Sequence, residues 1–431
     1  MAEPSFDVII IGAGAAGLIA ALELAQTGKK VAVIEAKDRV GGRACTVYDD
    51  RFDLPVELGA EFIHGELKLT RMLLKKANAD AYKLKGDIWQ NEDGTFDDQK
   101  DFIENYSALN KKFKQLNQDI SIADFTENYL QGPQFDELRF TLKNYVEGYY
   151  AGDMKKASTY FLKEELNNSD DIQFRIEGGY AKLIDYLYNH CREKGVAFYL
   201  SNPVKNIKWR KDRVEIDSEG NHLAAQKILI TVPIGVLQSE SIQFSPSIPK
   251  QIDAAKNLGF GPVIKTILQF DEAFWKNKTL TQNRDLSKMG FLFSKQIIPT
   301  WWTYYPKDAA MLTGWSGGPH AEEIKNLPEE EILQKAVQSL SEIFSIDASE
   351  IQQRLRAWYV ASWINDPYCR GGYSYEVVDA EKWKGILKQG VDDTIYFAGE
   401  GLFSGTEIGT VEAALVSGRE TAHQMVASFR K

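Results

Sequence analysis

Residues 6–17 read FDVIIIGAGAAG, and this stretch decides the fold that we expect for the chain. Residues 6–11 form a short apolar run rich in isoleucine, which is typical of a buried parallel strand. A glycine-rich turn follows, and residues 18–27 are predicted to form a helix that ends at Gly28. A second strand is predicted over residues 31–35. This strand–helix–strand opening predicts an α/β fold with a doubly wound, Rossmann-like sheet.

The turn contains Gly12, Gly14 and Gly17, spaced as in the G-x-G-x-x-G pattern of dinucleotide-binding proteins. At this spacing the first glycine permits a tight turn and the second lets the backbone approach a pyrophosphate. The third lets the helix and the strand pack closely. Ala15 and Ala16 also lie in this turn, at the start of a helix whose free N–H groups favour phosphate. The turn therefore predicts a dinucleotide site.

Glu35 ends the second predicted strand, eighteen residues after Gly17. Its carboxylate can accept hydrogen bonds from a ribose hydroxyl and would repel a 2′-phosphate, which disfavours NADP. These residues leave NAD and FAD open. A second loop, Arg39-Val40-Gly41-Gly42-Arg43, could place N–H groups and a cation beside a second phosphate, or could equally be a surface turn.

The composition narrows the possible partners. The 431 residues carry 51 Lys and Arg against 61 Asp and Glu, a net charge of −10, which argues against nucleic acid as the main partner. An acidic chain mildly favours cationic small molecules, although a solvated acidic surface kept for solubility is the better explanation of the charge alone. Three cysteines form neither a disulfide framework nor a metal site, and free thiols predict a cytoplasmic location. We expect no signal peptide and no membrane anchor.

The rest of the chain suggests two interleaved domains. Residues 66–166 show mainly helical periodicity, and an antiparallel sheet rich in Trp and Tyr is predicted from short strands at 263–270, 289–293, 300–305, 311–315 and 356–363. Strand patterns within 204–232 and at 394–398, with a helix over 410–429, continue the first fold. We therefore predict a nucleotide-binding domain over 1–70, 175–250 and 377–431. A mixed α+β substrate domain is predicted over 71–174 and 251–376.

Several segments, in order and at their spacing, resemble the FAD-dependent amine oxidases, which include monoamine, polyamine and histone-demethylating enzymes. The resemblance covers essentially the whole chain and implies a discontinuous, Rossmann-like FAD-binding domain of the GR2 type. The segments that carry it are residues 7–17 with Glu35, 39–43, 57–65 (ELGAEFIHG), 177–179 (EGG), 230–235 (ITVPIG), 261–265 (GPVIK), 363–375, 396–400 (YFAGE) and 409–414 (GTVEAA).

The resemblance implies FAD in an extended pose. Glu35 would hold the adenosine ribose, Arg43 would lie near the phosphates, and Val204 would contact the adenine. Monoamine oxidases attach the flavin to a cysteine that follows two glycines; here Tyr373 follows the glycines, so we expect non-covalent FAD. The other expected cofactor contacts are Ala36, Arg39, Gly42, Gly59, Ala60, Glu61, Phe62, Pro233, Trp363, Gly399, Glu400, Gly409, Thr410, Val411 and Ala414.

Lys265 is the candidate catalytic residue to which we give most weight. A lone lysine in a strand usually has a solvated side chain. In the family that this chain resembles, however, the matching lysine reaches the flavin N5 atom through a water molecule. The resemblance therefore implies that Lys265 positions this water and assists proton movement or oxygen chemistry.

Three further residues are candidates for substrate contact. Tyr375 could form one wall of an amine cage facing the flavin, while Thr410 stands where monoamine oxidases have the second tyrosine. His64 resembles the active-site histidine of animal polyamine oxidases and could hydrogen-bond a substrate amine, or it could satisfy a loop near the flavin. No metal site is predicted.

We expect a small-molecule amine as the substrate, with O2 as the oxidant and hydrogen peroxide as a product. L-amino-acid oxidases are the nearest alternative, but they carry an arginine for the substrate carboxylate just after the Glu-Leu-Gly segment, where this chain has Ala60-Glu61-Phe62. A related FAD desaturase or porphyrinogen oxidase, acting on C–C bonds, is a second alternative. The sequence predicts neither the exact amine nor the oligomeric state.

Overall fold

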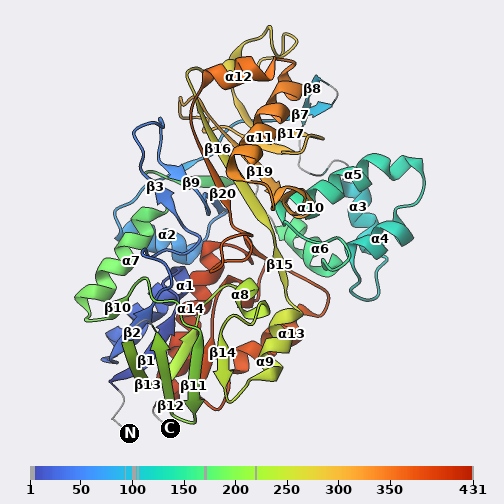
Figure 1. Cartoon of the computed structure of the whole chain (residues 1–431). Helices are drawn as coiled ribbons and strands as arrows, with labels where there is room; N and C mark the ends of the chain where they lie inside the picture. Colours follow the sequence, from blue (N-terminus) through green and yellow to red (C-terminus); the bar gives the residue numbers. More distant parts are fainter. Residues whose placement is uncertain are drawn as a thin grey trace.

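The computed structural model describes residues 5–92, 94–99, 103, 106–168, 172–218 and 221–429. Two large sheets organise the chain into two lobes, and the strands of each sheet come from distant parts of the sequence (Figure 1). The chain crosses between the lobes several times. The α/β class and the antiparallel second sheet expected from the sequence are confirmed.

The first sheet follows the order β10-β2-β1-β13-β12-β11-β14, and β22 also pairs with β13. The neighbours from β10 to β13, and β22 beside β13, run parallel, as the strand–helix–strand opening predicts. The strands are β1 (Phe6–Ile11), β2 (Val31–Ile34), β10 (Ala197–Tyr199), β11 (Asn206–Arg210), β12 (Arg213–Ser218), β13 (Asn221–Ile230), β14 (Gln243–Ser245) and β22 (Ile395–Phe397).

Both faces of this sheet are covered, which explains why β1 is apolar throughout. Val8 and Ile10 enter one hydrophobic core, packed by α1 (Ala15–Gln26), α7 (Ala181–Glu193) and α14 (Val411–Ser428). Ile9 and Ile11 enter a second core on the opposite face. That face is covered by α8 (Ile234–Gln238), α9 (Pro249–Lys256) and α13 (Ala380–Gln389).

The second sheet has the order β20-β16-β19-β18-β17-β7-β8 and forms the other lobe. Three helices pack on it through a core rich in aromatic side chains: α10 (Pro319–Ile324), α11 (Glu329–Phe344) and α12 (Ala348–Arg354). The strands are β7 (Asp87–Glu92), β8 (Thr95–Gln99), β16 (Val263–Phe270), β17 (Met289–Ser294), β18 (Thr300–Trp302), β19 (Met311–Gly317) and β20 (Leu355–Ser362).

A helical arm projects beside the second sheet (Figure 1). It contains α3 (Tyr106–Phe113), α4 (Ile122–Tyr129), α5 (Asp136–Asn144), the π-helical turn η2 (Tyr145–Tyr149) and α6 (Thr159–Asn168), with the short η1 (Pro133–Phe135). Smaller elements join the lobes: β3 (Thr46–Val47), β4 (Val56–Glu57), β5 (Phe62–His64), α2 (Lys68–Lys76), β6 (Ala81–Lys83), β9 (Gln173–Ile176), β15 (Gly259–Gly261), η3 (Phe274–Lys276), β21 (Tyr373–Tyr375) and η4 (Glu400–Leu402).

Residues 66–166 are mainly helical, as expected, but they also contain three strands that were not predicted: β6, β7 and β8. Of these, β7 joins the second sheet beside β17. The predicted strands and the final helix are found near their expected bounds. None of the helices among the described residues is long and apolar enough to cross a bilayer. The domain boundaries given above remain a prediction.

Candidate active site

A cavity of about 1120 Å³ extends through the region where the two lobes meet. One end is lined by the glycine turn after β1 and by the segment that follows β2, at the carboxyl ends of parallel strands. Open α/β sheets bind nucleotides at this edge. The other end is lined by α5, η2 and α6 of the helical arm and by β17. The cavity therefore joins a nucleotide-type site to a second compartment in the substrate lobe.

The glycine turn leaves space for a ligand at one glycine and none at another. A Cβ atom on Gly17 would lie 2.0 Å from the carbonyl oxygen of Gly12, so this glycine is needed for packing. A Cβ atom on Gly14 would meet nothing within 4 Å, and Gly14 lines the cavity. The backbone at Gly14 thus forms a cradle that a methyl group would fill, as a pyrophosphate-binding turn requires.

Glu35 is buried directly after β2, with its carboxylate held in a fixed position. One oxygen accepts a hydrogen bond from the backbone N–H of Ala13 at 2.7 Å, and the other accepts one from the backbone N–H of Lys37 at 2.9 Å. A carboxylate has further lone pairs that can accept ribose hydroxyls. Val204 also lines this end of the cavity. The residues present therefore fit an adenine dinucleotide such as FAD.

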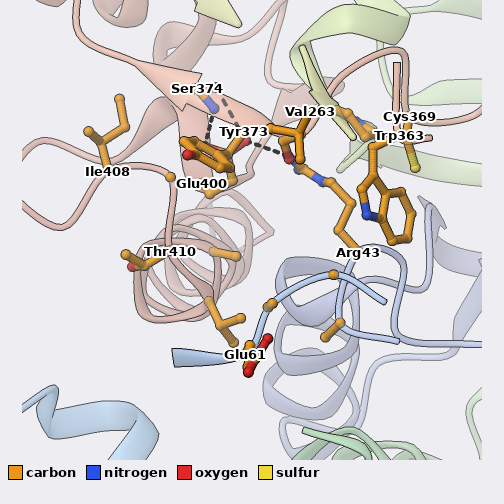
Figure 2. Close-up of a pocket in the computed structure, with 18 of the residues that line it drawn as sticks. Arg43, Glu61, Val263, Trp363, Cys369, Tyr373, Ser374, Glu400, Ile408 and Thr410 are labelled. Carbon is orange, nitrogen blue, oxygen red and sulfur yellow. Dashed lines mark hydrogen bonds and ion pairs between the residues drawn. The ribbon is translucent and has the colours of Figure 1, made fainter. Parts of the chain in front are cut away.

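Arg43 connects the N-terminal and C-terminal parts of the nucleotide lobe (Figure 2). Its Nη1 atom lies 2.9 Å from a carboxylate oxygen of Glu400 and donates to the carbonyl oxygen of Gly372 at 2.7 Å. Glu400 also accepts hydrogen bonds from the N–H and the hydroxyl of Ser374, at 3.3 and 3.2 Å. Arg43 lines the cavity and places a fixed positive charge in its wall.

Thr410 caps the N-terminus of α14. Its hydroxyl accepts a hydrogen bond from the N–H of Ala413 at 3.2 Å and donates one to the carbonyl oxygen of Glu407 at 2.6 Å. Thr410 and Val411 line the cavity, so the positive end of the α14 dipole lies in its wall. Because Thr410 has this capping role, its presence does not by itself indicate a contact with substrate.

Lys265 is almost completely buried, with 1% of its side chain exposed. Its Nζ atom lies 2.5 Å from Oε2 of Glu61 and also donates to the carbonyl oxygens of Glu57 at 2.6 Å and Gly59 at 3.3 Å. The solvated side chain that is usual for a strand lysine is therefore excluded. Lys265 lines the cavity beside the segment that starts at Gly59.

Glu61 joins two cations. Its Oε1 atom lies 2.6 Å from Nη2 of Arg175 and accepts a hydrogen bond from the indole N–H of Trp302 at 3.0 Å. Burial raises the pKa of Glu61, but the charges of Lys265 and Arg175 outweigh it and hold that pKa below its usual value. We call Glu61, Lys265, Arg175 and Trp302 the Glu61 cluster. Glu61 thus neutralises part of the charge of two buried cations, of which Lys265 lines the cavity.

His64 lies where the cavity passes from the Glu61 cluster to the helical arm. Its Nδ1 atom is 3.3 Å from the hydroxyl oxygen of Tyr149, and its ring packs against Phe62 and Tyr149. Burial lowers the pKa of His64 to about 4. The imidazole is therefore neutral at physiological pH and can exchange hydrogen bonds with a polar ligand without repelling an ammonium group.

The cavity brings together nearly all the site residues expected from the sequence. Those that line it are Gly12, Gly14, Ala15, Ala16, Glu35, Ala36, Gly42, Arg43, Gly59, Ala60, Glu61, Phe62, His64, Val204, Pro233, Lys265, Trp363, Gly399, Glu400, Gly409, Thr410, Val411 and Ala414. Their individual roles remain predictions. Gly17 acts in packing, as described above. Arg39 does not line the cavity, because its guanidinium donates to the carbonyl oxygens of Val40 and Gly42 within its own loop.

Tyr375 requires a correction, because it does not line the cavity. Its ring is buried in the hydrophobic core, and a Cβ atom on Gly152 or Gly259 would lie 3.3 or 2.9 Å from it. The pairing of β21 with β15 places the ring there. Tyr373 lines the cavity instead, with its ring stacked on Trp315 at 6.0 Å between centroids.

Sequence reasoning missed Arg175 and the tyrosines of η2. Arg175 lies on β9, where it is buried and contacts a glutamate more than one hundred residues earlier in the chain. An arginine between Phe174 and Ile176 is the local signal of this role. Cys369 also lines the cavity, but burial raises the pKa of its thiol to about 12, so it is a poor nucleophile. No cluster of potential metal ligands occurs among the described residues.

Comparison with known proteins agrees with this geometry. A profile of the family described as "Flavin containing amine oxidoreductase" matches residues 15–426. Human Lysine-specific histone demethylase 2 is 29% identical over 436 residues, which cover 91% of this chain and 50% of that protein. Polyamine oxidase 3 of Oryza sativa subsp. japonica is 26% identical over 468 residues, covering 99% of this chain and 91% of that protein. The chain thus spans about half the length of the demethylases that it matches.

Two solved structures share the fold. Wild-type putrescine oxidase bound to putrescine matches with a TM-score of 0.79 at 19% identity, over 98% of this chain and 99% of that chain. Cyclohexylamine oxidase from Brevibacterium oxydans matches with a TM-score of 0.79 at 20% identity, over 99% of this chain and all of that chain. At this level of identity the likeness establishes the fold alone.

Proposed function

Since the chain belongs to the flavin-containing amine oxidoreductase family, we propose that it binds FAD non-covalently in this cavity and oxidises a primary or secondary amine. The amine loses two electrons and two protons to become an imine, which water hydrolyses to an aldehyde and a shorter amine or ammonia. O2 takes up the two electrons and two protons to give hydrogen peroxide. FAD, when bound, supplies the two-electron acceptor between them.

The buried Lys265 in the cavity wall is the observation that carries this proposal. Its ammonium is oriented by Glu61 and by the carbonyl oxygens of Glu57 and Gly59. Glu61 and the carbonyl oxygen of Glu57 take two of its three N–H donors, whereas the contact with Gly59 is long at 3.3 Å. The third N–H is therefore the one that could bind a water molecule and donate a proton through it. Phe62, Trp302 and Trp315 exclude water from the adjoining wall. The residues thus supply orientation and a dry compartment.

The charge of the cavity argues against an L-amino-acid oxidase. A substrate carboxylate needs a cation in the substrate compartment. Between residues 66 and 173, the described residues that line the cavity include Glu66 and Glu165 but no Lys or Arg. A substrate carboxylate would find no cationic partner among these residues, whereas an ammonium group would find two acidic side chains. The substrates of a desaturase or a porphyrinogen oxidase would not bring an ammonium group to the reacting centre, so a carboxylate in the cavity wall would not help to bind them.

The test uses the purified holoenzyme and a panel of amines: spermine, spermidine, putrescine, tyramine, phenylethylamine and a peptide containing dimethyl-lysine. The peptide tests for demethylation of lysine, the activity for which the demethylase relatives are named. We expect at least one amine to bleach the flavin under nitrogen, and air to restore its colour with release of peroxide. Acid precipitation should leave the flavin in solution if attachment is non-covalent. An intact flavin that no amine reduces would contradict the proposal.

A cytoplasmic location, expected from the free thiols, remains part of this proposal. All three cysteines are unpaired and buried. O2 and a small-molecule amine are the partners that we propose.

A further inference from the structure

The end of the cavity that lies in the helical arm is built from aromatic side chains around one carboxylate. We call this end the aromatic recess; it is formed by Glu165 with Phe140, Tyr145, Tyr149, Phe291 and Phe293. Glu165 lies on α6, and the only hydrogen bond to its carboxylate from the described residues is a long one, 3.4 Å, from the hydroxyl of Tyr145. No lysine or arginine of the described part of the chain forms an ion pair with it. The recess thus holds a carboxylate without a counter-ion.

This arrangement is costly unless a cation enters. A carboxylate moved out of water without a partner loses solvation, and it responds by retaining its proton. Burial accordingly raises the pKa of Glu165 to about 8, and the hydrogen bond from Tyr145 compensates only in part. An ammonium group would supply the missing charge, and aromatic faces stabilise cations further. The recess therefore has the chemistry of an ammonium site.

A continuous series of contacts connects the recess to Lys265. The rings of Tyr145 and Tyr149 stack with centroids 5.1 Å apart, and the Tyr149 hydroxyl lies 3.3 Å from Nδ1 of His64. The His64 ring contacts Phe62, which packs on Trp302 of the Glu61 cluster. The two sites therefore lie at separate positions along one cavity, and a flexible chain with two polar ends could occupy both.

Hydrogen bonds anchor the wall of the recess to β19 of the second sheet and to β21. Tyr145 and Tyr149 belong to η2, and π-helical turns occur often at functional sites. The indole N–H of Trp315 donates to the carbonyl oxygen of Gly148 at 2.9 Å, and the hydroxyl of Tyr373 donates to the carbonyl oxygen of Tyr149. Trp315 and Tyr373 themselves line the cavity. The distance between the two sites is thus held by direct hydrogen bonds.

We propose that Glu165 binds a second ammonium group of the substrate, so that the enzyme prefers aliphatic diamines or polyamines of a particular length over monoamines. This inference rests on the proposed function. Glu165 selects the substrate by binding one of its ammonium groups. The amine at the other end of the substrate is the one that is oxidised. Glu165 is a specificity-determining residue and takes no part in proton or electron transfer.

The experiment compares α,ω-diamines of three to eight carbons with n-alkylamines of the same lengths, using the holoenzyme and the Glu165→Gln variant. For the best diamine we expect Glu165→Gln to raise KM at least tenfold and to leave kcat within about twofold. The KM for monoamines should change less than twofold. The matched control is Glu164→Gln, because Glu164 is the neighbouring residue on α6, is exposed and does not line the cavity. It should behave as the wild type.

A second variant keeps the charge and moves it. Glu165→Asp withdraws the carboxylate by one methylene, so the preferred diamine should become about one carbon longer. This result is expected only if the carboxylate contacts the substrate directly. Equal changes in KM for diamines and monoamines, or an unchanged length preference in both variants, would overturn the proposal.

A binding measurement separates this inference from the proposed function. Hexane-1,6-bis(trimethylammonium) has no nitrogen lone pair and is not oxidised, so its binding can be followed through the flavin absorption spectrum. We expect it to bind at least tenfold more tightly than hexyltrimethylammonium, and to lose this advantage in Glu165→Gln. If no amine reduces the flavin, the proposed function fails, while this titration still decides for or against the site. Equal affinities of the two ions in the wild type would refute it.

Discussion

The ammonium nitrogen of Lys265 lies 2.5 Å from the carboxylate of Glu61, and both side chains are almost fully buried in the cavity wall. Glu61 also binds Arg175 at 2.6 Å, so one carboxylate neutralises part of the charge of two buried cations. Lys265 comes from β16 of the substrate lobe and Glu61 from the segment between β4 and β5. The position of the candidate catalytic ammonium therefore depends on an ion pair between segments 204 residues apart in the sequence.

Glu61→Gln should destabilise the protein, because it leaves Lys265 and Arg175 buried without their counter-ion. Loss of one partner of a buried ion pair typically costs about 3–5 kcal/mol. Urea unfolding of the holoenzyme measures this change. Glu66→Gln is the control, since Glu66 is exposed and its contact with Arg71, at 3.4 Å, is a surface pair. Its effect should stay below about 1 kcal/mol. Equal stability of the two variants would contradict the structural role given to Glu61.

Lys265→Met should slow turnover or reoxidation of the flavin at least tenfold, because it removes the ammonium that we propose holds a proton-donating water at this wall. Glu61 would keep Arg175 and Trp302 as partners, so the variant is expected to fold. Stopped-flow absorbance separates the reduction of the flavin by amine from its reoxidation by O2. Lys276→Met is a suitable control, because Lys276 is a surface residue paired with Asp308. Rates equal to those of the wild type would remove Lys265 from the mechanism.

The sequence predicts best what is encoded locally. The bounds of β16 agree with expectation because an apolar, β-branched run defines them, and the turn at Gly12 is specified by its glycines. The hairpin of β7 and β8 was missed, since strands of sequence DIWQNE and TFDDQ carry a weak apolar signal. β7 is stabilised by pairing with β17, two hundred residues later, which no local pattern reveals.

In the candidate site, too, locally encoded features were predicted and features that depend on distant segments were not. Residues that bind through the backbone or a glycine turn could be identified from motifs, whereas contacts between distant side chains could not. Arg175 and Glu165 carry charges whose importance depends on burial and on which segment faces them. Tyr375 was misassigned because the direction of its ring follows from the pairing of β21 with β15. A motif specifies which residue is present, but packing decides where its side chain points.

Gly14→Ala and Gly17→Ala should separate cofactor binding from folding. At Gly14 the backbone conformation (φ −74°) suits alanine and the new methyl group meets no protein atom, so the apoprotein should keep its stability. The methyl would occupy the cradle, and the dissociation constant of FAD should rise at least tenfold. At Gly17 the methyl would lie 2.0 Å from a backbone oxygen, and such overpacking costs about 1–3 kcal/mol.

Thermal melting of the two apoproteins and FAD titration by flavin fluorescence measure both quantities. The expected pattern is an unchanged melting temperature with weak FAD binding for Gly14→Ala, and a lowered melting temperature for Gly17→Ala. Tight FAD binding by Gly14→Ala would show that the pyrophosphate does not approach this turn.

His64 should remain neutral throughout the range in which the enzyme is assayed. Its pKa in the folded protein is lowered to about 4 by burial, whereas an unfolded histidine titrates near 6.5. Between these values the unfolded chain binds a proton that the folded protein does not bind, so the free energy of unfolding falls as the pH is lowered from 6.5 towards 4. The contribution of this one group is at most about 3 kcal/mol.

Two measurements test this assignment. The chain has five histidines, so carbon-13 labelling of histidine and comparison with His64→Gln identifies the His64 resonance. That resonance should not titrate between pH 5.5 and 8. In urea unfolding, the stability difference between wild type and His64→Gln should shrink or reverse as the pH is lowered from 6.5 towards 4, because the variant has no group to protonate at this position. A His64 resonance that titrates near pH 6.5 would mean that the ring is solvated, and it would then repel the ammonium substrates proposed for this cavity.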